Sequence, residues 1–303
     1  MPPPHEACVL TRLVASSVRL SEAVDIRNSG DLQIVNKDQT GLMEDLQTEA
    51  DRSAQLCIER SLREKFGKNL TIVGEEEIEL PSTPFEPLEA LPPSHHFHIF
   101  LKDLVVWVDP LDGTSDFTKS KDNRALLRHV TVLIGITYKG RPVAGIVHQP
   151  FYNGEQSRTV WSIVGVGTFG LKKTAQQNMN FPKANEQMPP RVAVITFRAK
   201  GIGRVGGEKA DQRSVRNFFL YNINFIWQFY LFFERYAAGG TKKWDIAAPE
   251  ALLMAAGGTL SDMSGRQIRY DGPSVQLANS GGLLATASGV DHQVSGRKRK
   301  GLQ

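Results

Sequence analysis

An apolar run that ends in two aspartates constrains the fold of this chain more than any other feature. Residues 105–117 read VVWVDPLDGTSDF, with Asp109 and Asp112 three positions apart. The mostly apolar start is typical of a buried strand, and Pro110 and Gly113 predict a tight turn directly after it. Folding therefore crowds two like charges at the end of a core strand, which is unfavourable unless a positive ion lies between them.

This turn has the composition of a metal or phosphate site. Carboxylate oxygens without nearby His or Cys favour Mg²⁺ over Zn²⁺. A turn between a strand and a helix also presents backbone N–H groups that suit a phosphate, and Gly113 supplies the conformational freedom for it. The alternative is a solvated Asx turn in which the aspartates only cap neighbouring backbone groups. The turn alone does not decide between the two.

Other acidic residues stand at the ends of predicted elements. Glu75, Glu76 and Glu77 follow the expected strand TIVG, where the alternative is an exposed acidic loop, which we expect to hold for Glu77. Asp245 begins an expected helix, where the alternative is an N-cap. Asp51 lies on another expected helix, one position from its apolar ridge, where the alternative is a surface residue.

The rest of the chain alternates helices and strands. Its 303 residues are 41% hydrophobic and 22% charged, which is ordinary for a globular protein. Helices flanking mixed strands predict a layered fold of the α+β or α/β class. The polar stretch 171–190 predicts a boundary between domains at 1–172 and 173–303. We expect helices at 7–27, 42–66 and 244–258, and strands at 69–74, 105–109, 129–138, 141–150, 158–172 (two), 191–197, 258–262 and 281–287.

Charge and hydropathy exclude several other classes of protein. The net charge is +4, and we expect the basic tail at 295–301 to be a solvated end and not a nucleic-acid site. No run of 18 apolar residues predicts a membrane span, and the N-terminus has no secretory signal. Two cysteines form no disulfide framework. We therefore expect a cytoplasmic protein with no nucleic-acid partner and no membrane, and the oligomeric state stays open.

Four motifs together resemble a known group of enzymes. Asp51, GEE at 74–76, WVDPLDGT at 107–114 and WDIAAPEALLMAAGG at 244–258 occur in the order found in the inositol monophosphatase superfamily of magnesium-dependent, lithium-sensitive phosphomonoesterases. Longer stretches such as DLQTEAD at 45–51 and HVTVLIGITYKGRPVAGIVHQPFYN at 129–153 resemble its bisphosphate nucleotidase branch. The resemblance covers roughly residues 9–172 and 239–290.

The resemblance implies a fold, a metal and a set of roles. It implies a layered αβαβα sandwich that hydrolyses the 3′-phosphate of adenosine 3′,5′-bisphosphate, with 3′-phosphoadenylyl sulfate as a further substrate. Asp51 and Thr114 match the pair that activates the attacking water, and the Gly113 and Thr114 amides face the phosphate. Lys200 and Gly207 fall where the family contacts the nucleotide. The residues matching Mg²⁺ ligands are Glu75, Asp109, Asp112 and Asp245 through carboxylates and Leu111 through its carbonyl oxygen.

One region departs from the family pattern. Within residues 197–238, the stretch Phe197–Lys200 keeps only the arginine of the family's Thr-Arg-Ser-His run, and ten of the 20 residues at 217–236 are aromatic. We interpret that aromatic segment as a replacement of a native element, with an unusual core element as the alternative. The altered region leaves two rival functions open. One is an inositol phosphate phosphatase, and the other is a catalytically impaired chain that only binds metal or a partner.

Overall fold

The computed structural model describes two large parts of the chain and several short pieces. The described residues are 26–28, 30–37, 45–78, 103–153, 156–170, 192–195, 204–205, 208–209, 241–262, 264–272, 276–279, 281–286, 288 and 292. Most of the expected helix 7–27, the boundary at 171–190, the aromatic segment 217–236 and the candidates Lys200 and Gly207 lie outside them.

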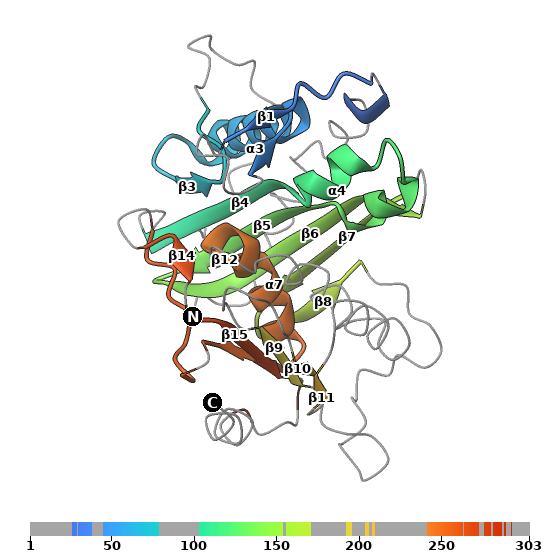
Figure 1. Ribbon diagram of the computed structural model, residues 1–303. Helices are drawn as coiled ribbons and strands as arrows, with labels where there is room; N and C mark the ends of the chain where they lie inside the picture. Colours follow the sequence, from blue (N-terminus) through green and yellow to red (C-terminus); the bar gives the residue numbers. More distant parts are fainter. Residues whose placement is uncertain are drawn as a thin grey trace.

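A six-stranded sheet forms the centre of the molecule (Figure 1). Its strand order is β3-β4-β5-β6-β7-β8; β3 and β4 run parallel and all other neighbours run antiparallel. The turn between β5 and β6 has positive φ at Lys139 and Gly140, at 48° and 73°, which is the conformation that two-residue hairpins prefer. The strands are β3 Thr71–Gly74, β4 Leu104–Asp112, β5 Thr131–Tyr138, β6 Arg141–Asn153, β7 Gln156–Ile163 and β8 Gly167–Phe169, all where the sequence predicts strands.

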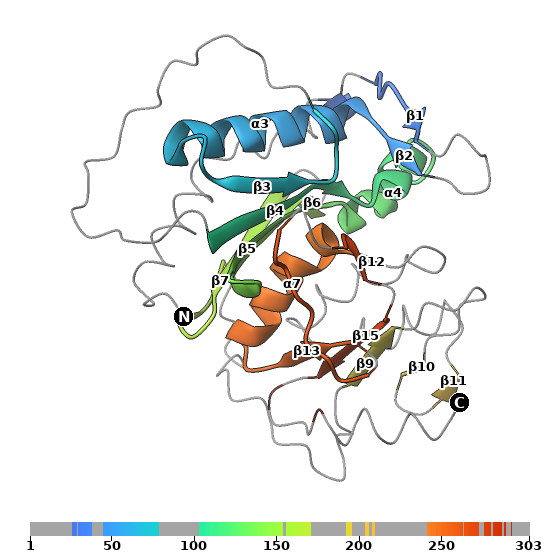
Figure 2. The same ribbon diagram turned by 90° about the vertical axis from the view of Figure 1, so that its left-hand side faces the viewer.

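Strand β4 is buried on both faces, which explains its nearly continuous apolar sequence. Because side chains alternate along a strand, Leu104, Val106 and Val108 join one hydrophobic cluster, and Val105 and Trp107 join another. The first cluster contains helix α3 residues from Glu49–Phe66, and the second contains helix α7 residues from Lys243–Ala255. The two helices therefore cover opposite faces of the sheet (Figure 2).

Helix α3 begins later than the predicted residue 42. Leu46–Gln47 form the short strand β2, which pairs with β1, Val35–Asn36, and Thr48 is the N-cap. The apolar spacing continues upstream of the helix, so periodicity alone misplaces its start. The expected stop is confirmed, because the helix ends at Phe66 and Gly67 follows with a φ of 79°.

Helix α7 lies unusually close to the sheet. Gly135 on β5 and Gly145 on β6 face it, and a Cβ on Gly145 would lie 2.5 Å from the Ala248 carbonyl oxygen. Residues 243–253 of the helix are all buried, as expected for a helix that is apolar nearly all round. Glu250 anchors it, because its carboxylate accepts hydrogen bonds from Arg141 at 3.0 Å and from the Tyr270 hydroxyl at 2.6 Å.

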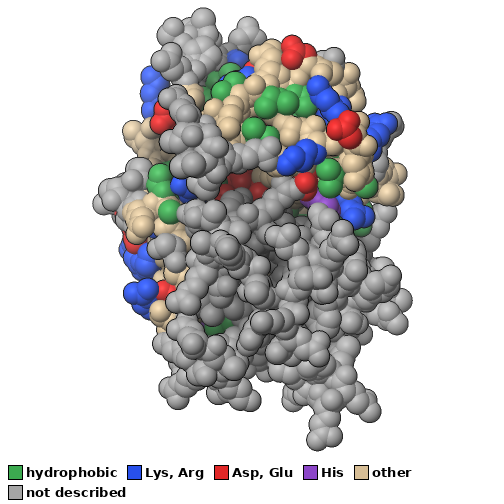
Figure 3. Space-filling model, viewed as in Figure 1, with side chains coloured by type: hydrophobic (Ala, Val, Ile, Leu, Met, Phe, Trp, Pro, Cys, Tyr) green, Lys and Arg blue, Asp and Glu red, His purple; other side chains and the backbone are tan. Residues whose placement is uncertain are grey.

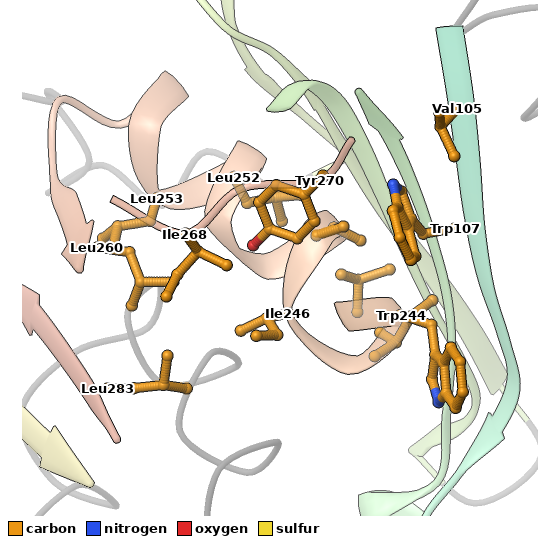
Figure 4. Packing of buried hydrophobic residues seen from close by; sticks show 14 of the residues in the cluster. Val105, Trp107, Trp244, Ile246, Leu252, Leu253, Leu260, Ile268, Tyr270 and Leu283 are labelled. Carbon is orange, nitrogen blue, oxygen red and sulfur yellow. The ribbon is translucent and has the colours of Figure 1, made fainter. Parts of the chain in front are cut away.

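A second, three-stranded sheet lies beyond α7. Its order is β13-β15-β9, and the apolar cluster between it and the first sheet contains Trp107, Trp244 and Tyr270 (Figure 4). Figure 2 shows α3, the large sheet, α7 and the small sheet in succession, which confirms the layered α+β class. The described residues form four of the five predicted layers. The remaining strands are β9 Val192–Ile195, β10 Arg204–Val205, β11 Glu208–Lys209, β12 Thr241–Lys242, β13 Thr259–Ser261, β14 Ala278–Asn279 and β15 Leu283–Thr286.

Candidate active site

The turn after the apolar run lies at the end of β4. The pairing of β4 with β5 shifts between Asp109 and Asp112, so the chain bulges there. Gly113 follows with a φ of 91°, in the left-handed region that glycine adopts without strain. The short helix α4, Thr114–Lys119, starts at the next residue. The sequence therefore places Asp109, Leu111, Asp112 and Thr114 within one reversal of the chain.

Both aspartates of the turn are buried. Asp109 is 1% exposed and accepts the Leu111 N–H at 3.1 Å, and Asp112 is 8% exposed and accepts the Thr131 hydroxyl at 3.3 Å. The hydrogen bond within the turn is the one that an Asx turn makes. The alternative of a solvated turn is nevertheless wrong, because neither carboxylate is in solvent. Burying charge without a cation is costly.

Asp51 lies in the first helical turn of α3, and its side chain contacts the chain reversal after Asp109. It is 1% exposed, so its interpretation as a surface residue is wrong. Its Oδ1 accepts the Thr114 hydroxyl at 3.0 Å, and its Oδ2 accepts the Thr48 N–H at 2.7 Å and the Thr48 hydroxyl at 2.5 Å. Burial raises the pKa of Asp51 to about 7, against the opposing Thr48 hydrogen bonds and with a smaller contribution from Glu76 and Glu75.

The three glutamates after β3 have different surroundings. Glu75 is partly exposed, and Lys37 Nζ lies 3.0 Å from its Oε1. Glu76 is buried, with Lys37 Nζ 3.2 Å from Oε1 and the Gln47 amide bonded to Oε2. Glu77 is exposed, as expected. Burial lowers the pKa of Lys37, but the charges of Glu75 and Glu76 more than offset this and raise it above its ordinary value.

Asp245 reaches the same region from the other face of the sheet. It lies in the first turn of α7, is 3% exposed, and accepts the Lys242 N–H at 2.7 Å. Its interpretation as an N-cap is wrong, because Lys242 occupies the N-cap and Asp245 is three residues further on. The glycines under α7 bring the start of this helix close to the sheet. That close approach carries Asp245 toward the end of β4.

The carboxylates act on one another electrostatically. Burial raises the pKa of Asp109 well above its ordinary value, and the charges of Glu75, Asp112, Asp245 and Asp51 raise it further. Burial and the charges of Glu75 and Asp112 do the same to Asp245. Five acidic residues from α3, the β3 end, the β4 turn and α7 therefore share one negative field. Figure 3 shows acidic side chains at the floor of a hollow in the surface.

The donor atoms of these residues fit a hard divalent cation by their chemistry. Among the residues that the structure describes, no group of three or more His, Cys, Asp or Glu side chains is arranged to hold a metal ion. The ammonium of Lys37 contacts Glu75 instead. All the candidate donors are oxygens, most are buried, and their mutual repulsion is the kind that Mg²⁺ or Ca²⁺ relieves.

The fold and the site together define a class of protein. It is a two-sheet α+β sandwich with a carboxylate site at the end of β4. The chain belongs to the inositol monophosphatase family, which it matches over residues 6–219 and 220–296. The junction of these two matches falls inside the aromatic segment 217–236.

Relatives with assigned names cover nearly the whole chain. The chain is 36% identical over 311 residues to human 3′(2′),5′-bisphosphate nucleotidase 1, covering 95% of this chain and 94% of that protein. It is 31% identical over 297 residues to the Dictyostelium discoideum protein of the same name, covering 89% and 88%.

Solved structures agree with the fold. The suhB protein of Bartonella henselae aligns with a TM-score of 0.54 at 17% identity, over 96% of this chain and 97% of that one. An IMPase/NADP phosphatase complexed with Mg²⁺ and phosphate aligns with a TM-score of 0.56 at 16% identity, over 96% and 95%. At these identities the likeness concerns the fold alone.

Two residues of the site were not predicted from the sequence. Lys37 follows β1 and reads as an ordinary surface lysine, and Glu76 was not distinguished from its acidic neighbours. Nothing local marks Lys37, which approaches Glu75 only through the fold.

Proposed function

We propose that this chain is a magnesium-dependent phosphomonoesterase that removes the 3′-phosphate of adenosine 3′,5′-bisphosphate and of 3′-phosphoadenylyl sulfate. The observation that carries the proposal is that four buried aspartates come from separate elements, next to the partly exposed Glu75 at the end of β3. The four are Asp51, Asp109, Asp112 and Asp245. The named nucleotidase relatives, at 36% identity over nearly all of the chain, favour this substrate over an inositol phosphate.

Five groups of the chain would hold the metal. They are the carboxylates of Glu75, Asp109, Asp112 and Asp245 and the carbonyl oxygen of Leu111. That carbonyl accepts the Thr114 hydroxyl at 3.1 Å, and a carbonyl oxygen has a second lone pair for an ion. Bound metal ions supply an acidified water and neutralise charge on the leaving oxygen.

Thr114 and Asp51 orient the attacking water in this proposal. The single Thr114 hydroxyl proton has two acceptors within reach, Asp51 Oδ1 at 3.0 Å and the Leu111 carbonyl at 3.1 Å. In this proposal it is donated to Asp51, so the hydroxyl oxygen is left to accept a hydrogen bond from water. Thr48 fixes the other carboxylate oxygen with two hydrogen bonds, so Asp51 cannot turn away. The backbone amides of Gly113 and Thr114 bind the phosphate. No covalent nucleophile is needed, because water attacks phosphorus directly.

The second half of the chain completes the site. Asp245 comes from residues 173–303, which we propose as a C-terminal domain, and the other metal-binding groups come from residues 1–172. Lys200 and Gly207 are proposed to contact the nucleotide. Among the described residues, no helix is long and apolar enough to cross a membrane. We place the activity in the cytoplasm and expect lithium to inhibit it, in line with the resemblance.

Phosphate release from a small substrate panel tests the proposal. The panel contains adenosine 3′,5′-bisphosphate, 3′-phosphoadenylyl sulfate and inositol 1-phosphate, each with Mg²⁺ and with a chelator. We expect magnesium-dependent release from the two nucleotides, and inhibition by lithium. Preferential release from inositol 1-phosphate supports the inositol phosphatase instead. No release from any substrate by a folded, metal-binding protein supports the impaired chain.

A further inference from the structure

A buried glutamine holds the segment that carries Glu75. Gln55 lies on α3 and is 1% exposed. Its Oε1 accepts the Glu76 N–H at 2.9 Å, and its Nε2 donates to the Glu76 carbonyl and, at 3.1 Å, to Glu59 Oε1. One side-chain amide therefore pairs with both backbone groups of Glu76. This is the pairing that a neighbouring strand makes with an edge strand.

The same segment is held from the opposite side by β4. The Glu75 N–H donates to the Val108 carbonyl at 3.0 Å, which continues the parallel pairing of β3 with β4 beyond Gly74. Successive residues of an extended chain direct their N–H groups to opposite sides, so Glu75 bonds to β4 and Glu76 bonds to Gln55. The backbone on either side of the Glu75 carboxylate is thus fixed at two points.

Gly74 leaves the space that Gln55 occupies. A Cβ at this glycine would overlap the side-chain amide of Gln55. The φ of Gly74 is not positive, so the need for glycine here is the close approach of the amide and not the backbone conformation. The missing side chain of Gly74 therefore makes room at the end of β3 for the side chain of Gln55.

Gln55 also ties this segment to Asp51. The two residues are four apart on α3, so they lie on one face of the helix. Asp51 bonds to Thr114 of the β4 turn, and Gln55 bonds to the segment after β3. A single rigid helix thus sets the position of the carboxylate that orients water relative to a carboxylate that binds metal.

We infer that Gln55 is a positioning residue for metal binding, which holds Glu75 in register with Asp109 and Asp51 by clamping the Glu76 peptide. The inference rests on the proposed function only in taking Glu75 as a metal ligand, and it does not depend on the substrate. Partners of ligands outside the coordination shell typically change metal affinity by about 10–100-fold. We expect an effect of that size from the loss of the clamp.

The first test replaces Gln55 with the isosteric methionine. Q55M loses both bonds to Glu76 and keeps the volume of the side chain. Binding of Mn²⁺ is measured by electron paramagnetic resonance on the full chain without substrate. We expect the dissociation constant to rise about 10–100-fold, and the amide of Glu76 to exchange with solvent faster in the metal-free protein.

A second variant tests the same contact while leaving Gln55 in place. G74A pushes the Gln55 amide away from the strand end and should weaken Mn²⁺ binding to a similar extent. Because both changes break the same contact, the combined loss of Mn²⁺ affinity in Q55M/G74A should be smaller than the sum of the two single losses. Additive effects of the two changes would overturn the inference, and so would unchanged affinity in folded Q55M or folded G74A.

The matched control is T137V on β5, where Thr137 pairs with Val105 at the end of β4 away from the site. Thr137 is buried and its hydroxyl bonds to Trp107 Nε1 at 3.0 Å and to the Val105 carbonyl at 3.2 Å, so its loss lowers stability by a comparable mechanism. Its Mn²⁺ affinity should stay that of the wild type. Weakened binding in T137V would show that general destabilisation suffices, and would contradict a role particular to Gln55.

The outcomes separate this inference from the proposed function. If Q55M weakens Mn²⁺ binding but the wild type hydrolyses no nucleotide, the inference stands and the proposed reaction fails. If the wild type hydrolyses the nucleotide and Q55M binds Mn²⁺ normally, the reaction stands and the inference fails. A wild type that binds no Mn²⁺ contradicts both.

Discussion

Asp51 has two structural tasks that its position in the sequence does not reveal. One carboxylate oxygen caps α3 through Thr48, and the other accepts the Thr114 hydroxyl. Helical spacing places it beside the apolar ridge, where a surface residue is the usual outcome, yet it is buried and bonds to Thr114 after the β4 turn. The sequence predicts the member residues of the site, whereas the burial and pairing of each one depend on elements far away in the chain.

Removing the Thr114 hydroxyl tests the water-orienting pair. We expect T114A to lower kcat by about 10²–10⁴-fold, the usual range for lost acid–base assistance, because Asp51 then has no path to the water. Mn²⁺ affinity should change little, since the side chain of Thr114 is not a proposed ligand. T114S, which keeps the hydroxyl, is the control and should retain most of the activity. Normal kcat in T114A would remove Thr114 from the mechanism.

Neutralising an aspartate of the β4 turn tests the metal assignment. We expect D109N and D112N each to abolish magnesium-dependent turnover. Without metal, each should melt at the same or a higher temperature than the wild type, because one of several repelling charges is gone. Thermal melting with and without Mg²⁺ measures both effects, and the wild type should be stabilised by the ion whereas the variants should not. Full activity in either variant would contradict the assignment.

His148 makes stability fall on the acid side. Burial lowers the pKa of His148 to about 4 from its ordinary 6.5. Between pH 6.5 and 4 the unfolded chain therefore binds a proton at His148 that the folded chain does not bind. The free energy of unfolding keeps its full value above about pH 6.5 and falls as the pH is lowered toward 4. The loss approaches about 3 kcal/mol. Denaturant unfolding at pH 7, 5.5 and 4 should show a steeper loss for the wild type than for H148N. Parallel profiles would contradict the assignment of this loss to His148.

At the scale of elements, the contact between α7 and the large sheet determines where Asp245 lies. Strands of the sheet were predictable because their period of two and their apolar runs follow from burial. The start of α3 was missed because two-residue strands such as β2 leave no periodic signal, although Thr48 and Asp51 form a capping pattern. The close approach of α7 had a signal in Gly135 and Gly145, since a glycine inside a strand often marks a near backbone.

Adding one methyl group under α7 tests this contact. G145A places a Cβ against the backbone of Ala248, so the helix must shift. We expect a loss of stability of about 1–3 kcal/mol, typical of overpacking, together with weaker Mn²⁺ binding because Asp245 moves with its helix. The control is I146V. The side chain of Ile146 packs in the hydrophobic cluster on the α3 side of the sheet, so this change should lower stability without changing metal affinity. If G145A binds Mn²⁺ with the affinity of the wild type, the position of α7 does not determine metal binding, and this account of Asp245 is contradicted.

At the scale of the whole molecule, the residues of the proposed active site come from both faces of one sheet. Glu75 follows β3, Asp109 and Asp112 lie at the end of β4, Asp51 comes from the helix above the sheet, and Asp245 comes from the helix below it (Figure 2). The family and the layered class were predictable because four motifs keep their order along the chain. The roles of Lys37, Gln47 and Gln55 around Glu76 were not, since polar residues at 37, 47 and 55 meet only after folding.

The most direct test of the account follows adenosine 3′,5′-bisphosphate by phosphorus NMR, with wild-type protein and with D245N. With Mg²⁺, the wild type should release inorganic phosphate and leave adenosine 5′-monophosphate, because the carboxylates from both sides of the sheet act together. D245N, and the wild type with a chelator, should release none. Equal release by D245N or without metal, or release of the 5′-phosphate in place of the 3′-phosphate, would contradict the account.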